Sequence, residues 1–363
     1  MPKISPMVAA ETTARRPVKI AILALSAGAV KLGAHLAKTV PADFYPCKGE
    51  LRQRFTALWH SYDALICIMA SGIVVRHIAP LMQDKLRDPA ILVLDERGRF
   101  VISLLSGHMG GANRLAQKVA ALCGGQAVIT TASDVLDLTA LDLWCASLGL
   151  QAADKKSFTR AMGRLVDKGS LQLWSDLPLP PLPPDIRPAA GPDEADLLIS
   201  HAVSVQARAD AQIKPEPAIL HPQALCLGIG CNRGTSKEDI AEAVQETLAR
   251  HNLARRSVTR LASIDLKADE EGLLAFAAGA ELPLDFFSKE ALNQVEAVQY
   301  SEAVFRATGA KGVAEPAALL AAGQQARLLV PKEKYADVTV AVACMAWPYP
   351  ASAQPDNEDT QDT

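Results

Sequence analysis

The stretch FVISLLSGHMGGANRLAQKVAALCGGQAVITTASD, residues 100–134, is the part of the chain around which its fold is organised. It opens with the apolar, β-type run Phe100–Leu105 and continues into a polar, glycine-rich corner. Apolar residues then recur at helical spacing up to Gly124-Gly125, and a second β-type run, Ala127–Thr131, follows. The pattern predicts a strand, a loop, a helix and another strand. Ligands of open α/β sheets bind beside strand ends and helix N-termini, so we expect a site here.

Size and composition describe an ordinary globular protein with more than one domain. The chain has 363 residues, of which 49% are hydrophobic and 21% charged, and this is too long for one typical core. The formal net charge of −3, without a long basic run, disfavours nucleic acid as a partner. The histidines form no HExxH or HxH cluster, so no metal site built by the protein is expected. Seven scattered cysteines without a CxxC pair predict reduced thiols: Cys47, Cys67, Cys123, Cys145, Cys226, Cys231 and Cys344.

The N-terminal region allows two interpretations. Arg15-Arg16 precede the apolar run Val18–Val30, which is the order of a targeting signal, but Lys19 interrupts the run. A first β-strand after a frayed lead is the favoured interpretation, and a targeting signal is the alternative. No apolar run reaches the roughly 20 residues that a membrane span requires. We therefore expect a cytoplasmic protein that does not bind membranes.

Alternating strand and helix patterns divide the chain into regions. Residues 17–140 predict a doubly wound α/β domain, and residues 223–347 predict a second α/β domain. Residues 141–206 form a smaller middle region. The expected fold class is thus two three-layer α/β domains joined by a proline-rich middle region. The remaining segments are expected to be a disordered lead at 1–16, a linker at 207–222 and a disordered acidic tail at 348–363.

The middle region contains the segment LPLPPLPPDIRPAAGP, residues 177–192, with seven prolines from Pro178 to Pro192. Such a segment favours polyproline II and is not expected inside a sheet. A stiff surface loop is the favoured interpretation. A recognition motif for the aromatic groove of a partner is the alternative.

A second glycine corner, Gly228–Ser236, precedes an expected helix at 237–251. Its G-x-G-x-x-x-G spacing differs from the dinucleotide fingerprint, and no acidic residue follows at the required distance, which disfavours a Rossmann cofactor site. Two interpretations stay open: a capped helix N-terminus that offers amides to a ligand carboxylate, and a structural tight turn. Cys231 would have a lowered pKa there if exposed, although a packed cysteine is more common.

The first corner, Ser106–Asn113, has neither the G-x-S-x-G elbow of serine hydrolases nor the lysine of a phosphate-binding loop. In one interpretation its glycines allow close packing and His108 only caps the helix. In the other, His108 titrates near neutrality and exchanges a proton with a bound substrate while amides hold an anion. Residues of neighbouring strand ends that would share this edge are Arg76, Asp88, Thr131 and Asp134.

Seven longer motifs occur along the chain: ASGIVVR at 70–76, DPAILVLDE at 88–96, LSGHMGGAN at 105–113, ITTASD at 129–134, LGIGCNRGTSKEDI at 227–240, SIDLKADEEGLLAFA at 263–277 and GVAEPAALLAAG at 312–323. Together and in this order they resemble the CbiG family, the cobalt-precorrin-5A hydrolases of the anaerobic cobalamin pathway. The C-terminal motifs also resemble the CobE-type protein of the aerobic pathway. The resemblance covers about residues 18–150 and 223–345. The middle region matches weakly, and ASD stands where the family would have ATD.

The resemblance implies a hydrolysis of a cobalt-bearing, ring-contracted tetrapyrrole that carries a δ-lactone. Water would open the lactone, and the extruded carbon would leave with its methyl group as acetaldehyde. The cobalt would arrive with the substrate, so no cofactor held by the protein is expected. A homodimer and contacts with other enzymes of the cobalamin pathway stay open.

This chemistry needs a base and donors for an oxyanion, and the resemblance suggests which residues supply them. His108 would be the base, with Asp134 beside it. Ser106, Asn113 and the amides of Gly110 and Gly111 would hold the oxyanion. Arg76 and Arg233 would bind substrate carboxylates. The other residues expected to bind substrate are Ser71, Gly72, Asp88, Gly107, Thr131, Gly230 and Cys231.

Two other functions were weighed against hydrolysis. A non-catalytic tetrapyrrole carrier or scaffold is the main alternative, because the CobE-type relative of residues 223–345 occurs alone. A nucleotide-binding regulator is disfavoured, because the phosphate-loop lysine and the dinucleotide acid are both missing.

Overall fold

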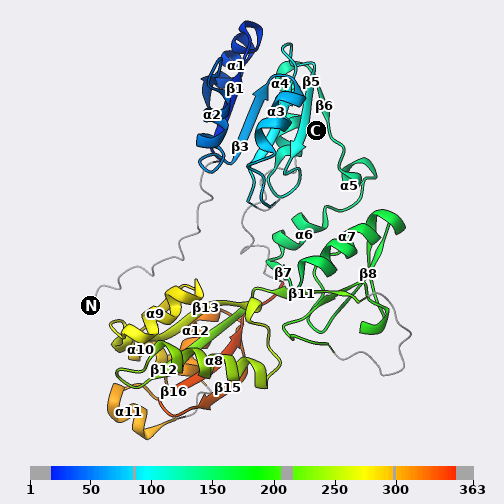
Figure 1. Cartoon of the computed structure of the whole chain (residues 1–363). Coiled ribbons are helices and arrows are strands. Elements are labelled where there is room, and N and C mark those ends of the chain that lie inside the picture. Colours follow the sequence, from blue (N-terminus) through cyan, green and yellow to red (C-terminus); the bar gives the residue numbers. More distant parts are fainter. Residues whose placement is uncertain (1–17, 85–86, 206–215, 297–299, 349–363) are drawn as a thin grey trace, which may run out of the picture. The chain divides into compact units, whose positions relative to one another are not determined.

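Three β-sheets organise the part of the chain that the computed structural model describes, residues 18–84, 87–205, 216–296 and 300–348 (Figure 1). The chain divides into two compact units between Leu143 and Trp144, called here the N-terminal and C-terminal units. The expected disordered lead, residues 207–215 of the expected linker and the expected tail beyond Pro348 lie outside the described residues.

A six-stranded sheet forms the centre of the N-terminal unit, with the order β2-β1-β3-β4-β5-β6. Strands β1 to β4 are parallel, β5 is antiparallel to β4, and β6 is parallel to β5. The order 2-1-3-4-5 is that of flavodoxin-like doubly wound sheets, although β5 here runs the other way. The strands are β1 (Ile20–Ala24), β2 (Ala42–Pro46), β3 (Ala64–Ile68), β4 (Ala90–Leu94), β5 (Phe100–Leu105) and β6 (Gln126–Val128).

Helices cover both faces of this sheet. All residues of β1, β3 and β4 are buried, which explains their continuous apolar runs. Ile22 and Ile66 pack towards α1 (Ala27–Thr39) and α4 (Ala112–Cys123), whereas their neighbours in the chain pack towards α2 (Leu51–Leu58) and α3 (Ser71–Ile78). The three-layer α/β domain expected from the sequence is therefore confirmed.

The reversal of β5 separates the strand ends that carry the expected site residues. Strands β1 to β4 end at one edge of the sheet, here called the opposite edge. Strands β5 and β6 end at the other edge, where β4 begins, here called the site edge. β6 stops at Val128, and residues Ala132–Val135 form the short helix α5 instead of a longer strand. The side chains of Thr131 and Asp134 bond to residues of the β5–α4 corner, which turns this segment away from the ladder.

The middle region has its own five-stranded sheet, with the order β7-β11-β10-β8-β9. Two expectations need correction. Residues 218–222, expected to be linker, are strand β11, which pairs with β10 and β7. Pro188, which was expected outside any sheet, lies in β9. Because β9 is an edge strand, the backbone N–H that proline lacks is not needed for a hydrogen bond to a neighbouring strand. The elements are α6 (Leu141–Ser147), β7 (Leu150–Ala152), α7 (Lys155–Lys168), β8 (Leu171–Ser175), β9 (Ile186–Pro188), η1 (Pro192–Glu194), β10 (Leu197–Ile199) and β11 (Ala218–Pro222).

The third sheet has the order β14-β13-β12-β16-β15, with β12 to β14 parallel and the other two pairings antiparallel. Its strands are β12 (Leu225–Cys231), β13 (Val258–Ile264), β14 (Leu284–Phe287), β15 (Arg327–Lys334) and β16 (Val338–Cys344). Its helical elements are α8 (Lys237–Arg250), η2 (Arg255–Ser257), η3 (Asp265–Lys267), α9 (Glu271–Ala280), α10 (Lys289–Gln294), α11 (Glu302–Thr308) and α12 (Ala314–Ala322).

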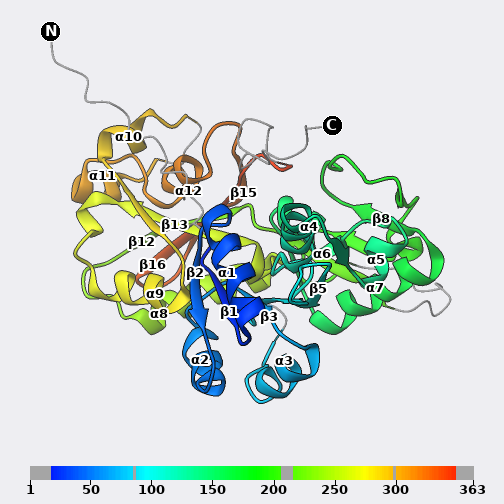
Figure 2. The same ribbon diagram turned by 90° about the horizontal axis from the view of Figure 1, so that it is seen from above.

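Helix α12 packs across one face of this third sheet, and α8 packs on β16 with α9 at its side (Figure 2). The α12 contact is unusually close at Gly228. A Cβ atom there would lie 1.8 Å from the carbonyl oxygen of Ala314, so only glycine fits. Glycine at this position of the second corner therefore serves helix packing.

Candidate active site

The corner between β5 and α4 is a tight turn closed by its own backbone. The amides of Ala112 and Asn113 donate to the carbonyls of Ser106 and Gly107, at 3.2 and 3.0 Å. Ser106 has the left-handed φ of 59°. A Cβ atom on Gly110 would lie 2.4 Å from the Cβ of Ser106, so this position requires glycine. The turn fixes the backbone on both sides of His108.

His108 lies between two carboxylates. Its Nε2 is 2.7 Å from Oδ2 of Asp134, and its Nδ1 is 3.3 Å from Oδ1 of Asp142, in the first turn of α6. The Ser133 hydroxyl lies 3.3 Å from Nε2. Only 15% of the His108 side chain is exposed, so water screens these interactions weakly. Neither ring nitrogen is left without a polar partner.

The two carboxylates raise the pKa of His108 to about 9, chiefly through the hydrogen bond with Asp142, against the effect of burial, with the Asp134 bond adding to it. With a pKa of about 9, His108 is predominantly protonated at pH 7. The expectation that His108 titrates near neutrality is therefore wrong. At neutral pH it is an imidazolium, which can donate a proton or a hydrogen bond but is a poor base.

Asn113 holds Asp134 in place instead of facing a ligand. The buried Asn113 amide group donates to Asp134 Oδ2 at 3.0 Å and to the Thr131 hydroxyl at 3.1 Å. Its carbonyl oxygen accepts from the Ser103 hydroxyl at 2.6 Å. His108 and Asn113 both donate to Oδ2 of Asp134. The other carboxylate oxygen, Oδ1, takes no part in these two hydrogen bonds. The side-chain nitrogen and oxygen of Asn113 are thus both engaged, so Asn113 positions Asp134 and is not available as the expected ligand contact. The Thr131 hydroxyl accepts one of these hydrogen bonds.

The other expected oxyanion donors are mostly engaged. The Ser106 hydroxyl donates to the Asp88 carbonyl at 2.9 Å, and the Gly111 amide donates to the His108 carbonyl at 2.9 Å. The Asp88 carboxylate accepts from the Gln83 amide, which makes it part of a structural turn. Gly107 allows the close approach of Asn113. The Gly110 amide was also expected to bind the oxyanion. It donates to no backbone carbonyl among the described residues, so it is available to a ligand.

Ser71, Gly72 and Arg76 are not part of this arrangement. They lie in α3, which follows the end of β3 and so belongs to the opposite edge of the sheet. The Arg76 guanidinium donates to the Gly72 carbonyl within the same helix. The expectation that Arg76 shares an edge with His108 is wrong, because β5 runs antiparallel to β4.

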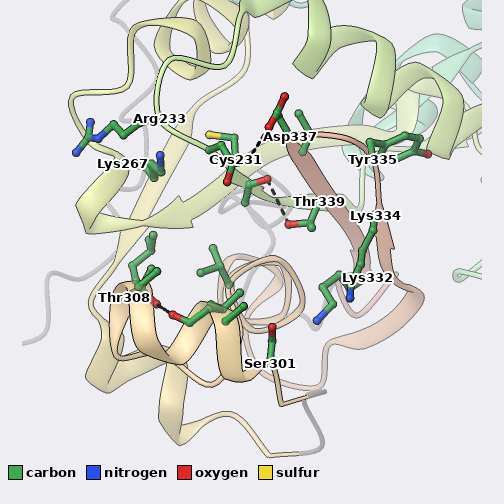
Figure 3. A pocket seen from close by; sticks show the side chains of 18 of the residues that line it. Cys231, Arg233, Lys267, Ser301, Thr308, Lys332, Lys334, Tyr335, Asp337 and Thr339 are labelled. Carbon is green, nitrogen blue, oxygen red and sulfur yellow. Dashed lines mark hydrogen bonds between the residues drawn. The ribbon is translucent and has the colours of Figure 1, made fainter.

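Gly230, Cys231 and Arg233 belong to the C-terminal unit, where they line a cavity of about 750 Å³ (Figure 3). Arg233 is 2.5 Å from the Asp269 carboxylate and also donates to the Leu266 carbonyl. Burial raises the pKa of the Cys231 thiol, so the reactive thiolate considered for an exposed Cys231 is not favoured. Nothing in the sequence had pointed to the lysines that line the same cavity, Lys267, Lys332 and Lys334.

Two residues of the His108 cluster were missed by sequence reasoning. Asp142 lies 34 positions after His108, in helix α6, and no local spacing links the two. Ser133 belongs to the motif ITTASD, and nothing in that motif singles it out as a site residue. A hollow of about 400 Å³ adjoins Asp134 and is lined also by Gln117, Ile129 and Ser133. A ligand in this hollow can reach the Asp134 carboxylate.

Two further features are absent from the residues that the structure describes. None of the helices there combines the length and apolar character needed to cross a bilayer. In the same ranges, no three or more histidine, cysteine or acidic side chains are grouped so that they could hold a metal ion.

Comparison with known proteins matches both units. Residues 53–134 match the family model described as "Cobalamin synthesis G N-terminal", and residues 225–343 match "Cobalamin synthesis G C-terminus". The "Cobalt-precorrin-5A hydrolase" of Priestia megaterium is 38% identical over 312 residues, which cover 82% of this chain and 83% of that protein. That of Salmonella typhimurium is 35% identical over 328 residues, 85% of this chain and 93% of that protein. "Protein CobE" of a Sinorhizobium species is 38% identical over 122 residues, 33% of this chain and 79% of that protein.

Proposed function

The chain belongs to the cobalamin synthesis G family and is a hydrolase of cobalamin biosynthesis, and we propose that its reaction is the hydrolysis of cobalt-precorrin-5A with release of acetaldehyde. The substrate is then a tetrapyrrole, and the cobalt belongs to that substrate. The proposal includes cleavage of a carbon–carbon bond after the lactone has been opened. No cofactor held by the protein takes part in it.

One observation carries the assignment of the chemistry: an imidazolium held between two carboxylates beside a hollow. His108 at neutral pH cannot supply a base, but Asp134, which is 34% exposed at the hollow, can accept a proton from water. The imidazolium, hydrogen-bonded to the same carboxylate, can donate its own proton or stabilise negative charge nearby. The pair therefore provides both a proton acceptor and a proton donor.

The proposed reaction has two stages. First, Asp134 takes a proton from water as the water oxygen attacks the lactone carbonyl. Asp134 then gives this proton to the leaving oxygen as the acyl C–O bond breaks, which yields a free hydroxyl group, restores the Asp134 carboxylate and leaves a carboxylic acid that loses its proton to solvent. The Gly110 amide and the His108 imidazolium stabilise the oxyanion of the tetrahedral intermediate. Second, Asp134 removes the hydroxyl proton, the oxygen forms a C=O bond, and the carbon–carbon bond to the macrocycle breaks. The electron pair of that bond passes into the conjugated macrocycle, and acetaldehyde leaves.

The direct test is anaerobic incubation of the purified chain with cobalt-precorrin-5A, with released aldehyde trapped as a hydrazone. Acetaldehyde that increases in proportion to enzyme and to time is expected. The non-catalytic carrier predicts a different result, namely tight binding of the tetrapyrrole and no aldehyde. That outcome would overturn the hydrolase proposal for this chain.

A further inference from the structure

The cavity of the C-terminal unit combines an apolar wall with a cationic rim (Figure 3). It has a volume of about 750 Å³, within the range of small-molecule sites. Its polar side is built from the ends of β12 and β13 and from the β15–β16 hairpin. The apolar side chains that line it are Ile264, Leu266, Ala303, Val304, Ala307 and Val313.

The four cations of the rim differ in whether they are already paired. Lys267 is 3.0 Å from the buried Glu270 carboxylate, and Arg233 is 2.5 Å from Asp269. Neither Lys332 nor Lys334 has an ion pair with a carboxylate among the described residues. In Figure 3 the Lys332 and Lys334 side chains lie on the other side of the cavity from Lys267 and Arg233. The rim thus offers two cations that are available to an anionic ligand.

Strand geometry explains why both lysines face the cavity. Lys332 and Lys334 are two positions apart on β15, so their side chains lie on the same face of the strand. Glu333, between them, points the other way and pairs with Arg250 and His251, at 3.0 and 2.8 Å. Glu333 is therefore held on the far face of the strand by these pairs. A second acid, the buried Glu315, accepts from the Lys332 backbone amide at 2.9 Å and not from its ammonium group.

We propose that this cavity binds the carboxylate-bearing face of a flat, largely apolar macrocycle, with Lys332 and Lys334 each pairing with a peripheral carboxylate. The identification of that ligand as a tetrapyrrole rests on the proposed function. The apolar wall contacts the ring, and the two ammonium groups give charge-assisted hydrogen bonds to carboxylates. A compact phosphate ester would use the cations but leave the apolar wall without a partner.

Uroporphyrin III, an apolar ring with eight carboxylates, is a suitable probe, and its absorption and fluorescence report binding to the full-length chain. We expect Lys332→Gln/Lys334→Gln to weaken binding about tenfold at 0.1 M salt, and each single substitution to weaken it about threefold. Lys237→Gln, at an exposed position of α8 outside the cavity, is the matched control and should bind within about twofold of the wild type. Higher salt should reduce the difference between wild type and double variant.

Three results would overturn the inference: no uroporphyrin binding, equal binding by wild type and double variant, or displacement of uroporphyrin by ATP at similar concentration.

Measuring acetaldehyde release as well distinguishes a failure of this inference from a failure of the proposed function. If both are right, the double variant raises KM while kcat stays within about twofold. Lysine-dependent binding without acetaldehyde from the wild type would overturn the proposed function alone. Acetaldehyde release without lysine-dependent binding would overturn this inference alone.

Discussion

The position of His108 between Asp134 and Asp142 predicts a pH-dependent contribution to stability. Its pKa is raised from 6.5 to about 9 in the folded chain, whereas in the unfolded chain it returns to 6.5. A group whose pKa is raised by folding stabilises the fold fully below its unfolded pKa and loses this effect as pH rises through its folded pKa. The raised pKa of about 9 corresponds to about 3 kcal/mol of unfolding free energy, present at pH 6 and absent above about pH 9.5.

The perturbation is His108→Gln, which removes the titrating charge and retains a polar side chain. Urea unfolding followed by circular dichroism at pH 6 and pH 9.5 measures the loss of stability relative to the wild type. We expect the loss to be about 3 kcal/mol larger at pH 6 than at pH 9.5. His60→Gln, at an exposed histidine of the same unit, is the control and should show no such difference. An equal loss at both pH values for His108→Gln would refute the reasoning.

The remaining predictions concern activity and packing. The value of kcat/KM for acetaldehyde release should fall as pH rises through about 9, because His108 loses the proton that it donates; an undiminished rate at pH 10 would contradict this. Asn113→Ala should lower kcat about tenfold with little change in KM, since Asp134 loses a positioning hydrogen bond, and steady-state assays would show otherwise if KM alone changed. Arg76→Ala should leave kcat/KM within about twofold of the wild type, because Arg76 lies at the opposite edge of the sheet, and a loss of tenfold or more would place it in the site. Gly228→Ala should lower the free energy of unfolding by about 3 kcal/mol, because its Cβ would collide with the backbone of α12, and an unchanged urea midpoint would refute that contact.

Much of the N-terminal fold could be predicted because its central strands are buried on both faces. Runs such as Ala64–Ile68 leave little ambiguity about position or length. The direction of β5 was also contained in the sequence. The short turn Asp95–Gly98 can join only antiparallel strands, and this places the end of β5 at the edge where β4 begins. Because β5 ends at that edge, His108 lies at the edge of the sheet opposite to Arg76.

The contacts that set the chemistry of His108 could not be predicted in the same way. Asp142 reaches His108 from another helix, and its role depends on tertiary packing that no local pattern records. The protonation state of His108 follows from that contact, so the expected base becomes a proton donor. Strand β11 was missed for a related reason: prolines at 215, 217 and 222 indicated a linker, while pairing with β10 and β7 decides the structure of residues 218–222.

Asp134→Asn tests the central claim most directly, because it preserves the shape of the side chain and removes the proton acceptor. Acetaldehyde released from cobalt-precorrin-5A would be measured for the wild type, for Asp134→Asn and for Asp167→Asn, an exposed position of α7. We predict a loss of kcat of at least about a hundredfold for Asp134→Asn, which is typical of removing a general base, and no change for Asp167→Asn. Wild-type turnover by Asp134→Asn would contradict the account.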